Sequence, residues 1–222
     1  AAAPVPGLPT TGVPSTPSRI LRNATDMIVT RILAVLALLA SSAALAAPKD
    51  EVFAAWEAMF AAKSYRARIE TTVNNQVFQQ VVEVVLPGRM RMSGGPAGDM
   101  VVTPEGAWLK APGEDWMQAP AATAALGKQF LSRDFIEQAK AGVRSVKALG
   151  TEDVDGNPAR IYQMEQTMTI VGVESSSSTK LFVDVASGRP VRQEIESTAM
   201  GRSSRTVQTL EYLADLKIDA PK

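Results

Sequence analysis

Alternating apolar and polar positions along most of the chain predict short antiparallel strands. Tyr65, Ala67, Ile69, Thr71 and Val73 share one parity, and the residues between them are charged or polar. This period of two is typical of a strand that buries one face. Similar runs, each bounded by turn-forming residues, predict about ten strands: residues 65–73, 77–86, 89–92, 100–102, 107–110, 146–154, 159–173, 180–185, 191–197 and 205–213.

Three polar segments predict connections between these strands. Asn74-Asn75 and Asp155-Gly156-Asn157 are typical of tight turns. The second segment lacks the longer spacing of oxygen ligands that a calcium loop needs, so we expect a turn and no metal. Residues 175–178 are four consecutive serines and predict a polar loop tip.

Spacings of three and four residues predict helices in two places. The first would begin at Asp50 as N-cap and carry an apolar stripe of Val52, Phe53, Trp56, Met59 and Phe60. Residues 121–143 are rich in alanine and predict one or two more helices, interrupted near Gly127 and restarted with Ser132 as N-cap. The fold class is therefore mainly β (α+β), a strongly curved antiparallel sheet whose concave face the helices cover.

The first 46 residues have the pattern of a leader and a signal peptide. Residues 27–46 contain Arg31, an apolar run over residues 32–40 and small residues that end in an Ala44-Leu45-Ala46 cleavage site. An uncleaved membrane anchor is the alternative, but the run is shorter than the ~20 residues that span a bilayer. Residues 1–26 are proline-rich and read as a disordered or artefactual leader, or as a start assigned too early. We expect cleavage after Ala46, export, and a single domain over residues 47–222.

Composition excludes several kinds of chemistry. The chain has no cysteine and no histidine, so it can form no disulfide, thiolate or imidazole metal site, Cys-His pair or Ser-His-Asp triad. The 23 basic and 23 acidic residues balance, which argues against nucleic acid as a partner. We expect no enzyme activity and no cofactor; catalysis would have to depend on carboxylates or tyrosines. Without a lipid-bearing cysteine, the exported product is expected to be untethered.

Several local strings, taken in order, resemble one family. They are Ser64-Tyr65-Arg66-Ala67, Leu86-Pro87 followed by basic residues, residues 101–108 (VVTPEGAW), Asp115-Trp116 with Pro120, residues 181–184 (LFVD) and residues 187–191 (SGRPV). In this order the chain resembles the periplasmic lipoprotein carriers with the LolA/LolB-like fold. The resemblance implies an open half barrel over an apolar cavity, a periplasmic location, and a lipid or acylated protein as cargo. An inner-membrane donor and an outer-membrane acceptor would be its partners, and we expect a monomer.

The resemblance also implies the ligand contacts. They would be apolar residues of the concave face and of the inserted helix: Met90, Met92, Met100, Trp108, Trp116, Met117, Phe130, Phe135, Tyr162, Met164, Met168 and Ile170. Methionine suits a cavity for cargo of variable shape, although ordinary core packing is the alternative for each methionine. The carriers have an arginine before the strand-ending proline that ties the helices shut, where this chain has Leu86. Arg89 or Arg91 could serve as a gate instead.

Two functions fit these expectations. The first is a carrier that shields an acyl chain from water. The second is a periplasmic protein-binding module, such as an envelope-stress sensor or regulator, that uses the same fold without lipid transfer. The nature of the cargo, the partners and the strand face that lines the cavity are left open by the sequence.

Overall fold

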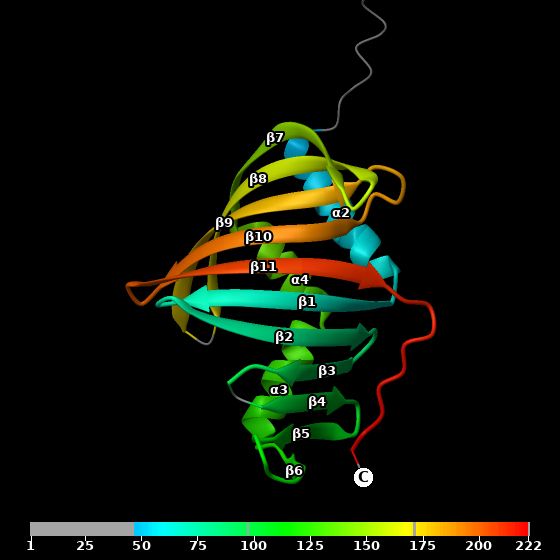
Figure 1. The fold of residues 1–222 in the computed structure, drawn as a ribbon, viewed down its shortest axis with the longest axis vertical. Helices are drawn as coiled ribbons and strands as arrows, with labels where there is room; N and C mark the ends of the chain where they lie inside the picture. The colour runs from blue at the N-terminus through cyan, green and yellow to red at the C-terminus, as the bar shows by residue number, and fades with distance from the viewer. Residues whose placement is uncertain (1–46, 97, 171, 222) are drawn as a thin grey trace, which may run out of the picture. The chain divides into compact units, whose positions relative to one another are not determined.

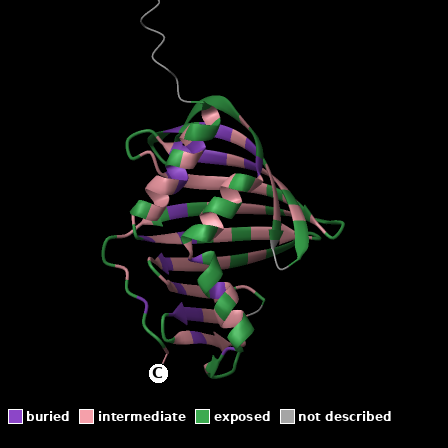
Figure 2. Ribbon diagram, turned by 180° about the vertical axis from the view of Figure 1, so that it is seen from behind, coloured by how far each residue is buried: buried purple, intermediate pink, exposed green. Residues whose placement is uncertain are grey.

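The computed structural model describes residues 47–96, 98–170 and 172–221. The predicted leader (residues 1–26) and signal peptide (residues 27–46) lie outside the described residues. Within them, one antiparallel sheet of eleven strands carries three helices on one face, as the two opposite views show (Figures 1 and 2). The sheet is strongly curved and does not close, so the predicted mainly β class with an open, helix-covered sheet is confirmed.

The strand order follows two meanders that meet in the middle of the sheet. It runs β6-β5-β4-β3-β2-β1-β11-β10-β9-β8-β7, so β6 and β7 are the two edges. The strands are β1 (Ser64–Val73), β2 (Gln76–Val85), β3 (Arg89–Gly94), β4 (Asp99–Thr103), β5 (Gly106–Lys110), β6 (Met117–Gln118), β7 (Val143–Val154), β8 (Asn157–Ile170), β9 (Val173–Asp184), β10 (Pro190–Ala199) and β11 (Arg202–Tyr212). The strand beyond the predicted ten is the two-residue β6.

The predicted turns occupy the left-handed backbone region. Asn74 and Asn75 have φ of 49° and 63°, and Asp155 and Gly156 have φ of 52° and 84°. Asparagine, aspartate and glycine tolerate this region, which two-residue hairpin loops require. These turns fix the register of β1 with β2 and of β7 with β8.

The serine loop tip is a wrong prediction. Residues 175–178 lie inside β9, and they pair on one side with β8 and on the other with β10. Cross-strand partners satisfy a serine hydroxyl there: Ser178 Oγ donates to Glu165 Oε1 at 2.6 Å and accepts from Gln163 Nε2 at 2.7 Å. Serine is a turn former mainly when its hydroxyl bonds its own backbone, so central strands with polar neighbours can accommodate it.

Helix α2 (Pro48–Ala61) begins earlier than predicted. Its N-cap is Ala47, without a side-chain bond, and Asp50 lies in the first turn, so the expected Asp50 cap is wrong. Proline starts the helix because it needs no hydrogen-bond partner for an N–H and its φ is already helical. Asp50 and Glu51 still favour this end through the helix dipole.

The inserted segment forms α3 (Ala121–Phe130) and α4 (Arg133–Gly142). Ser132 caps α4 as predicted, since its Oγ accepts from Phe135 N at 3.2 Å. The predicted break near Gly127 is wrong, because α3 continues to Phe130. A Cβ at Gly127 would lie 2.7 Å from Val102 Cγ2, so the glycine lets α3 approach β4.

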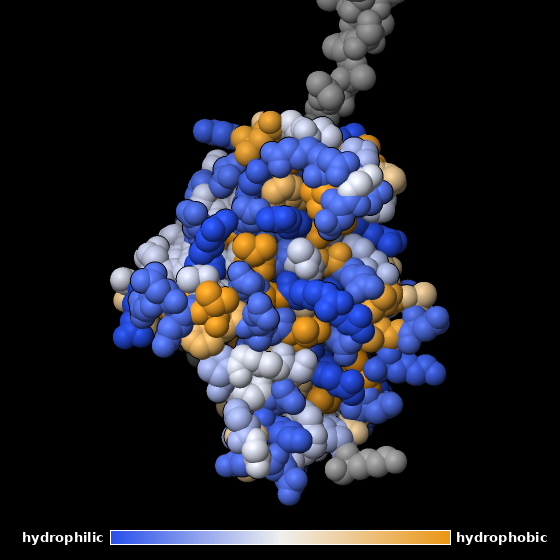
Figure 3. Space-filling view, in the orientation of Figure 1, coloured by the Kyte–Doolittle hydropathy of each residue, from blue (hydrophilic) through white to orange (hydrophobic). Residues whose placement is uncertain are grey.

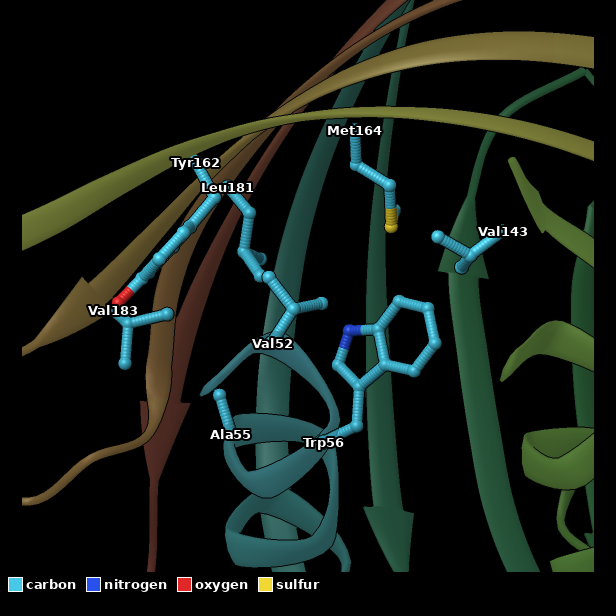
Figure 4. Close-up of a cluster of buried hydrophobic side chains, with 8 residues drawn as sticks. All are labelled: Val52, Ala55, Trp56, Val143, Tyr162, Met164, Leu181 and Val183. Carbon is cyan, nitrogen blue, oxygen red and sulfur yellow. The ribbon is translucent and has the colours of Figure 1, made fainter. Parts of the chain in front are cut away.

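The predicted stripe of α2 forms the main core with the strands beneath it. Val52, Ala55 and Trp56 are buried against β8 and β9, where Tyr162 and Leu181 lie (Figure 4). A second cluster, under α3, is built from β2 to β5 and the chain on either side of α3: Val84, Met90, Val102, Ala107, Ala119 and Leu131. The space between these two clusters is where a cavity remains.

Candidate ligand cavity

Strand alternation gives the sheet two faces of different chemistry. We call the face covered by α2, α3 and α4 the inner face and the opposite one the outer face (Figures 1 and 2). Met164 of β8 lies on the inner face, because it packs in the core with Trp56 of α2. The pairing of Met164 with Thr179, and of Thr179 with Ile195, carries this face across β9 and β10.

A cavity of about 260 Å³ lies between the helices and the inner face. Its lining comes from α2, the α3–α4 segment and strands β1, β8, β9 and β10: Trp56, Met59, Phe60, Tyr65, Leu86, Phe130, Leu131, Phe135, Ile136, Ala139, Met164, Gln166, Met168, Ser177, Thr179, Gln193 and Ile195. No lining residue is an aspartate, glutamate, lysine or arginine. The site is therefore apolar with a few uncharged polar groups, the composition typical of small-molecule pockets.

Two larger hollows lie elsewhere and have a different character. Their volumes are about 730 and 700 Å³, and outer-face residues such as Arg68, Glu70, Glu165 and Arg205 line them. Both are open grooves between rows of charged and hydroxyl side chains. Shallow, wet surfaces of this kind provide little apolar burial, so the smaller inner cavity is the better candidate site.

The polar groups of the cavity come from the sheet. Thr179 is buried, with Met164 on one side and Ile195 on the other. Gln193 of β10 lies two residues before Ile195 on the same face and pairs with Leu181. Gln166 Nε2 donates to the carbonyl oxygen of Ala139 in α4 at 2.8 Å, which fixes the end of that helix to β8.

Tyr65 brings the one hydroxyl of an aromatic side chain to the lining. Burial raises the pKa of Tyr65 to about 12. Its ring lies 6.3 Å from that of Tyr212, whose hydroxyl donates to the carbonyl oxygen of Pro190 at 2.7 Å. Tyr65 is therefore neutral at physiological pH and cannot serve there as a base.

Helix α4 covers the cavity without being buried itself. None of its residues is buried, although Phe135, Ile136 and Ala139 contribute to the cavity lining. Phe130 at the end of α3 meets Phe135 edge to face, with ring centroids 5.0 Å apart, and Phe130 is 38% exposed. Helix α4 is therefore held to the protein by partly buried contacts and not by a buried stripe.

Ion pairs around Glu57 hold α4 against α2. Glu57 Oε2 lies 2.8 Å from Arg133 Nη2, and Glu57 Oε1 lies 2.5 Å from Lys140 Nζ. Lys140 also pairs with Glu137 at 2.9 Å. The hydrogen bond from Lys140 lowers the pKa of Glu57, and the bond to Glu57 raises the pKa of Lys140. We call these four residues the Glu57 cluster.

Five of the predicted ligand residues lie at the cavity or beside it. Met164, Met168, Phe130 and Phe135 line it. Tyr162 is buried in the adjoining core and its hydroxyl donates to Glu51 of α2 (Figure 4). Ile170 ends β8, and its side chain lies outside the described part of the structure.

The predicted methionines of β3 and β4 lie elsewhere on the inner face. Met90 is buried in the cluster under α3, and Met100 packs against that cluster. Met92 pairs with Met100, and its sulfur accepts from Gln80 Nε2 at 3.7 Å. None of these three residues is among the lining residues of the cavity.

The predicted residues of β5 and β6 are also separate from the cavity. Ala107 pairs with Val102 and both belong to the cluster under α3, whereas Trp108 pairs with Val101, so alternation places the indole on the outer face. Trp116 lies under Lys110, whose Nζ is 6.0 Å from the ring centroid. Met117 is 55% exposed at the sheet edge. The parity of the short strand β5 could not be set from its sequence, because both of its faces carry apolar residues.

The two predicted gate residues contact other parts of the chain. Arg89 Nη1 donates to the carbonyl oxygen of Ile218 at 2.9 Å, and Arg89 Nη2 lies 3.5 Å from Glu105. Arg91 lies 3.8 Å from Glu83 on the outer face. Neither forms an ion pair with α3 or α4 in the described residues. Arg89 instead fixes the C-terminal segment, in which Ile218 is buried.

Sequence reasoning missed much of the lining. Trp56, Met59 and Phe60 were recognised as an apolar stripe, and Leu131 with Ile136 belongs to an apolar face that was visible in the α3–α4 segment. The polar lining residues Gln193, Thr179 and Ser177 gave no such signal. Gln193 has the same parity as Ile195 in β10, and Ser177 and Thr179 have the same parity as Leu181 in β9. This shared parity was the one indication in the sequence that these polar residues face inward.

The described residues contain neither a metal-binding cluster nor a membrane-spanning helix. No cluster of His, Cys, Asp or Glu is arranged there to hold a metal ion. None of the described helices combines the length and apolar character that crossing a bilayer requires.

Comparison with known proteins gives matches in structure but not in sequence. No family model and no curated protein matches the chain. The lipoprotein LppX of Mycobacterium tuberculosis matches with a TM-score of 0.56 and 16% identity, over 77% of this chain and 97% of that one. LprF of Mycobacterium bovis matches with a TM-score of 0.51 and 14% identity, over 79% and 98%. MucB in complex with MucA(peri) matches with a TM-score of 0.45 and 14% identity, over 79% and 59%. The chain thus has the LolA-like fold that its sequence resemblance predicted.

Proposed function

We propose that this protein binds the acyl chain of a lipid or lipoprotein in the inner-face cavity and carries it through the periplasm, without catalysis. The observation that supports this proposal is the cavity lining, which is mostly apolar and contains no charged residue. The same fold in LppX, which is named as a lipoprotein, agrees with a place in the cell envelope. The predicted signal peptide agrees with export.

The energetics of acyl transfer favour an enclosed cavity over a surface groove. Each methylene removed from water gains about 0.8 kcal/mol. A sixteen-carbon chain therefore needs on the order of 13 kcal/mol of shielding to match its environment in a membrane. The lining residues from three helical segments and four strands surround a guest on several sides, which the outer grooves do not.

The cavity volume indicates that binding a long chain moves the helices. The value of about 260 Å³ lies just under the ~300–1,000 Å³ of ordinary ligand pockets. Helix α4 has no buried residue, so among the three covering helices it is the one that we expect to move. We infer that α4 is displaced when a long chain enters, which breaks the ion pairs of Glu57 with Arg133 and Lys140 and the hydrogen bond from Gln166 to Ala139.

Blocking the cavity from its floor tests the proposal. Ile195→Trp would fill the space, and Thr198→Trp, an exposed position of opposite parity on the same strand, is the matched control. We expect Ile195→Trp to weaken binding of a hydrophobic fluorophore at least tenfold, with binding by Thr198→Trp unchanged. Native mass spectrometry of protein purified from its envelope should find acyl chains on the wild type and on the control. Folded wild-type protein that carries no lipid and ignores the fluorophore contradicts the proposal.

Protein binding in place of lipid transfer is the second candidate function, and one observation favours it. The edge strand β7 is twelve residues long, and Leu149 in it is 53% exposed. Such an edge can receive a strand from a partner. A stoichiometric protein that copurifies without lipid, and whose binding Leu149→Lys abolishes, would select this function over the carrier.

A further inference from the structure

The inner face is free of charge across the middle of the sheet. The pairing registers assign to it the following residues of β8, β9, β10, β11 and β1: Tyr162, Met164, Gln166, Met168, Ser177, Thr179, Leu181, Gln193, Ile195, Ser197, Ser204, Thr206, Gln208, Leu210, Ala67, Ile69 and Thr71. All are apolar or uncharged polar residues. The two arginines of the same parity lie near strand ends: Arg160 pairs with Glu51, and Arg202 begins β11.

Uncharged polar residues on this face lie among the apolar ones. Gln193 pairs with Gln208, Ile195 with Thr206, and Ser197 with Ser204. The last pair is hydrogen-bonded at 2.8 Å between the two hydroxyls. A molecule that lies along the strands would therefore meet apolar side chains together with uncharged amide and hydroxyl groups.

Gln193 and Thr179 are the polar groups placed to contact a guest. Both line the cavity, and Thr179 is 3% exposed. Within the described residues, the polar lining side chain with a hydrogen bond to another part of the protein is Gln166, which donates to the carbonyl oxygen of Ala139. A guest carbonyl or hydroxyl can bond the Gln193 amide and the Thr179 hydroxyl, whereas a wholly apolar guest would leave these groups unpaired.

A charged group has no partner in this environment. The lining offers no basic residue to a carboxylate or phosphate and no acidic residue to an amine. Burial of an unpaired charge costs far more free energy than burial of an ester or hydroxyl that is hydrogen-bonded. The same cavity therefore discriminates between ligands with identical chains and different head groups.

We propose that the ligand is an uncharged amphiphile, whose chain lies against the helices and whose ester, amide or hydroxyl group bonds Gln193 and Thr179. This inference rests on the proposed lipid-binding function and specifies its ligand class. Free fatty acids and other singly charged lipids are excluded by the cavity rather than accepted by it.

Head-group competition tests the inference. Monolauroylglycerol, laurate and dodecyltrimethylammonium share a chain length and would displace a bound hydrophobic fluorophore, below their micelle concentrations, at pH 8. We expect monolauroylglycerol to bind at least tenfold more tightly than either ion. Equal affinities for the three compounds would overturn the ligand class while leaving the proposed function intact. No displacement by any of them would instead count against the proposed function.

Two substitutions locate the discrimination. Gln193→Leu replaces the amide with an apolar group of similar size. We expect it to weaken the binding of monolauroylglycerol at least fivefold without weakening the binding of the fluorophore. Gln193→Lys supplies a cation to the cavity, and we expect it to raise the affinity for laurate relative to that for monolauroylglycerol. The control is Gln79→Leu, an exposed position of β2 that faces the outer groove. Circular dichroism checks that the Gln193→Leu variant is folded. If the folded variant still prefers monolauroylglycerol to the two ions as the wild type does, the amide has no part in recognition.

Discussion

The inner and outer faces of this sheet are made by the same strands yet differ in kind. In β10, Gln193 and Ile195 face the cavity, while the side chains of Arg192 and Glu194, which alternate with them along the strand, lie 2.7 Å apart on the outer face. In β1, Ala67 is buried while Arg66 lies 2.8 Å from Glu83 and 3.4 Å from Glu211. Figure 3 shows the outer face, where hydrophilic side chains surround smaller hydrophobic patches.

This difference shows how a sheet without a second β-layer can keep one face apolar and the other hydrated. Charges on the outer face satisfy one another across strands and keep that face hydrated. Phe182, an apolar side chain on the outer face, is flanked by two cations: Lys180 Nζ is 4.9 Å and the Arg192 guanidinium 5.5 Å from its ring centroid. The inner face is covered by helices instead, and charge there would be buried without a partner.

The largest expected effect comes from placing a charge on the inner face. Leu181 is 0% exposed beneath α2, so Leu181→Asp would bury a carboxylate in the main core. We expect a loss of more than about 4 kcal/mol in the free energy of unfolding, or no folding. Thr198→Asp on the outer face should change stability by less than about 0.5 kcal/mol. Urea unfolding followed by circular dichroism measures both, and equal losses would abolish the distinction between the faces.

A smaller effect is expected from loosening the helix that covers the inner face. Glu57→Gln removes the charge that pairs with Arg133 and Lys140. These are partly exposed pairs, so the global stability should fall by only about 0.5–1 kcal/mol. Amide hydrogen exchange within α4 and the fluorophore association rate should both rise several-fold. Glu137→Gln, which removes only the pair with Lys140, is the control and should have less effect on either rate.

Acid should act on the same cluster. The pKa of Glu57 is lowered from its ordinary value of 4.5, chiefly by the hydrogen bond from Lys140. Its ion pairs are thus fully formed above pH 4.5 and are lost as the pH falls through the lowered pKa. The fluorophore association rate in stopped flow should therefore rise as the pH falls from 4.5 through the lowered pKa of Glu57. Glu57→Gln should abolish this rise, and a rise that persists in the variant would assign it to other carboxyl groups.

The sequence was a good guide wherever periodicity carried the information. The alternation in β1 and the stripe of α2 predicted which residues enter the core, because helical and strand periods are set by local backbone geometry. The Ser132 cap was predictable for the same reason. The sheet curvature followed from strand twist, but which helices cover which strands depends on pairings far apart in sequence.

The candidate site was harder to predict because it depends on parity across non-local pairs. Trp108 was expected to line the cavity on the strength of its size, yet the register of β5 with β4 places it on the outer face. Arg89 was expected near the helices and instead contacts Ile218, 129 residues away in sequence. The residue types of Gln193 and Thr179 do not by themselves indicate a site. Their proposed contact with a ligand follows only from the position of β10 and β9 at the cavity.

The smallest effect is expected from an exposed pair on the outer face. Arg68 Nη2 lies 3.7 Å from Glu211 Oε2, and the two side chains are 64% and 52% exposed. Water already solvates both groups, so Arg68→Ala should change the free energy of unfolding by less than about 0.5 kcal/mol. This change in the free energy of unfolding should shrink as the salt concentration rises to 0.15 M and above, where the Debye length is about 8 Å or less. A loss above about 1 kcal/mol in urea unfolding at high salt would mean that the outer face is packed like the inner one, because screening removes the charge term and leaves only the contacts of the side-chain stem.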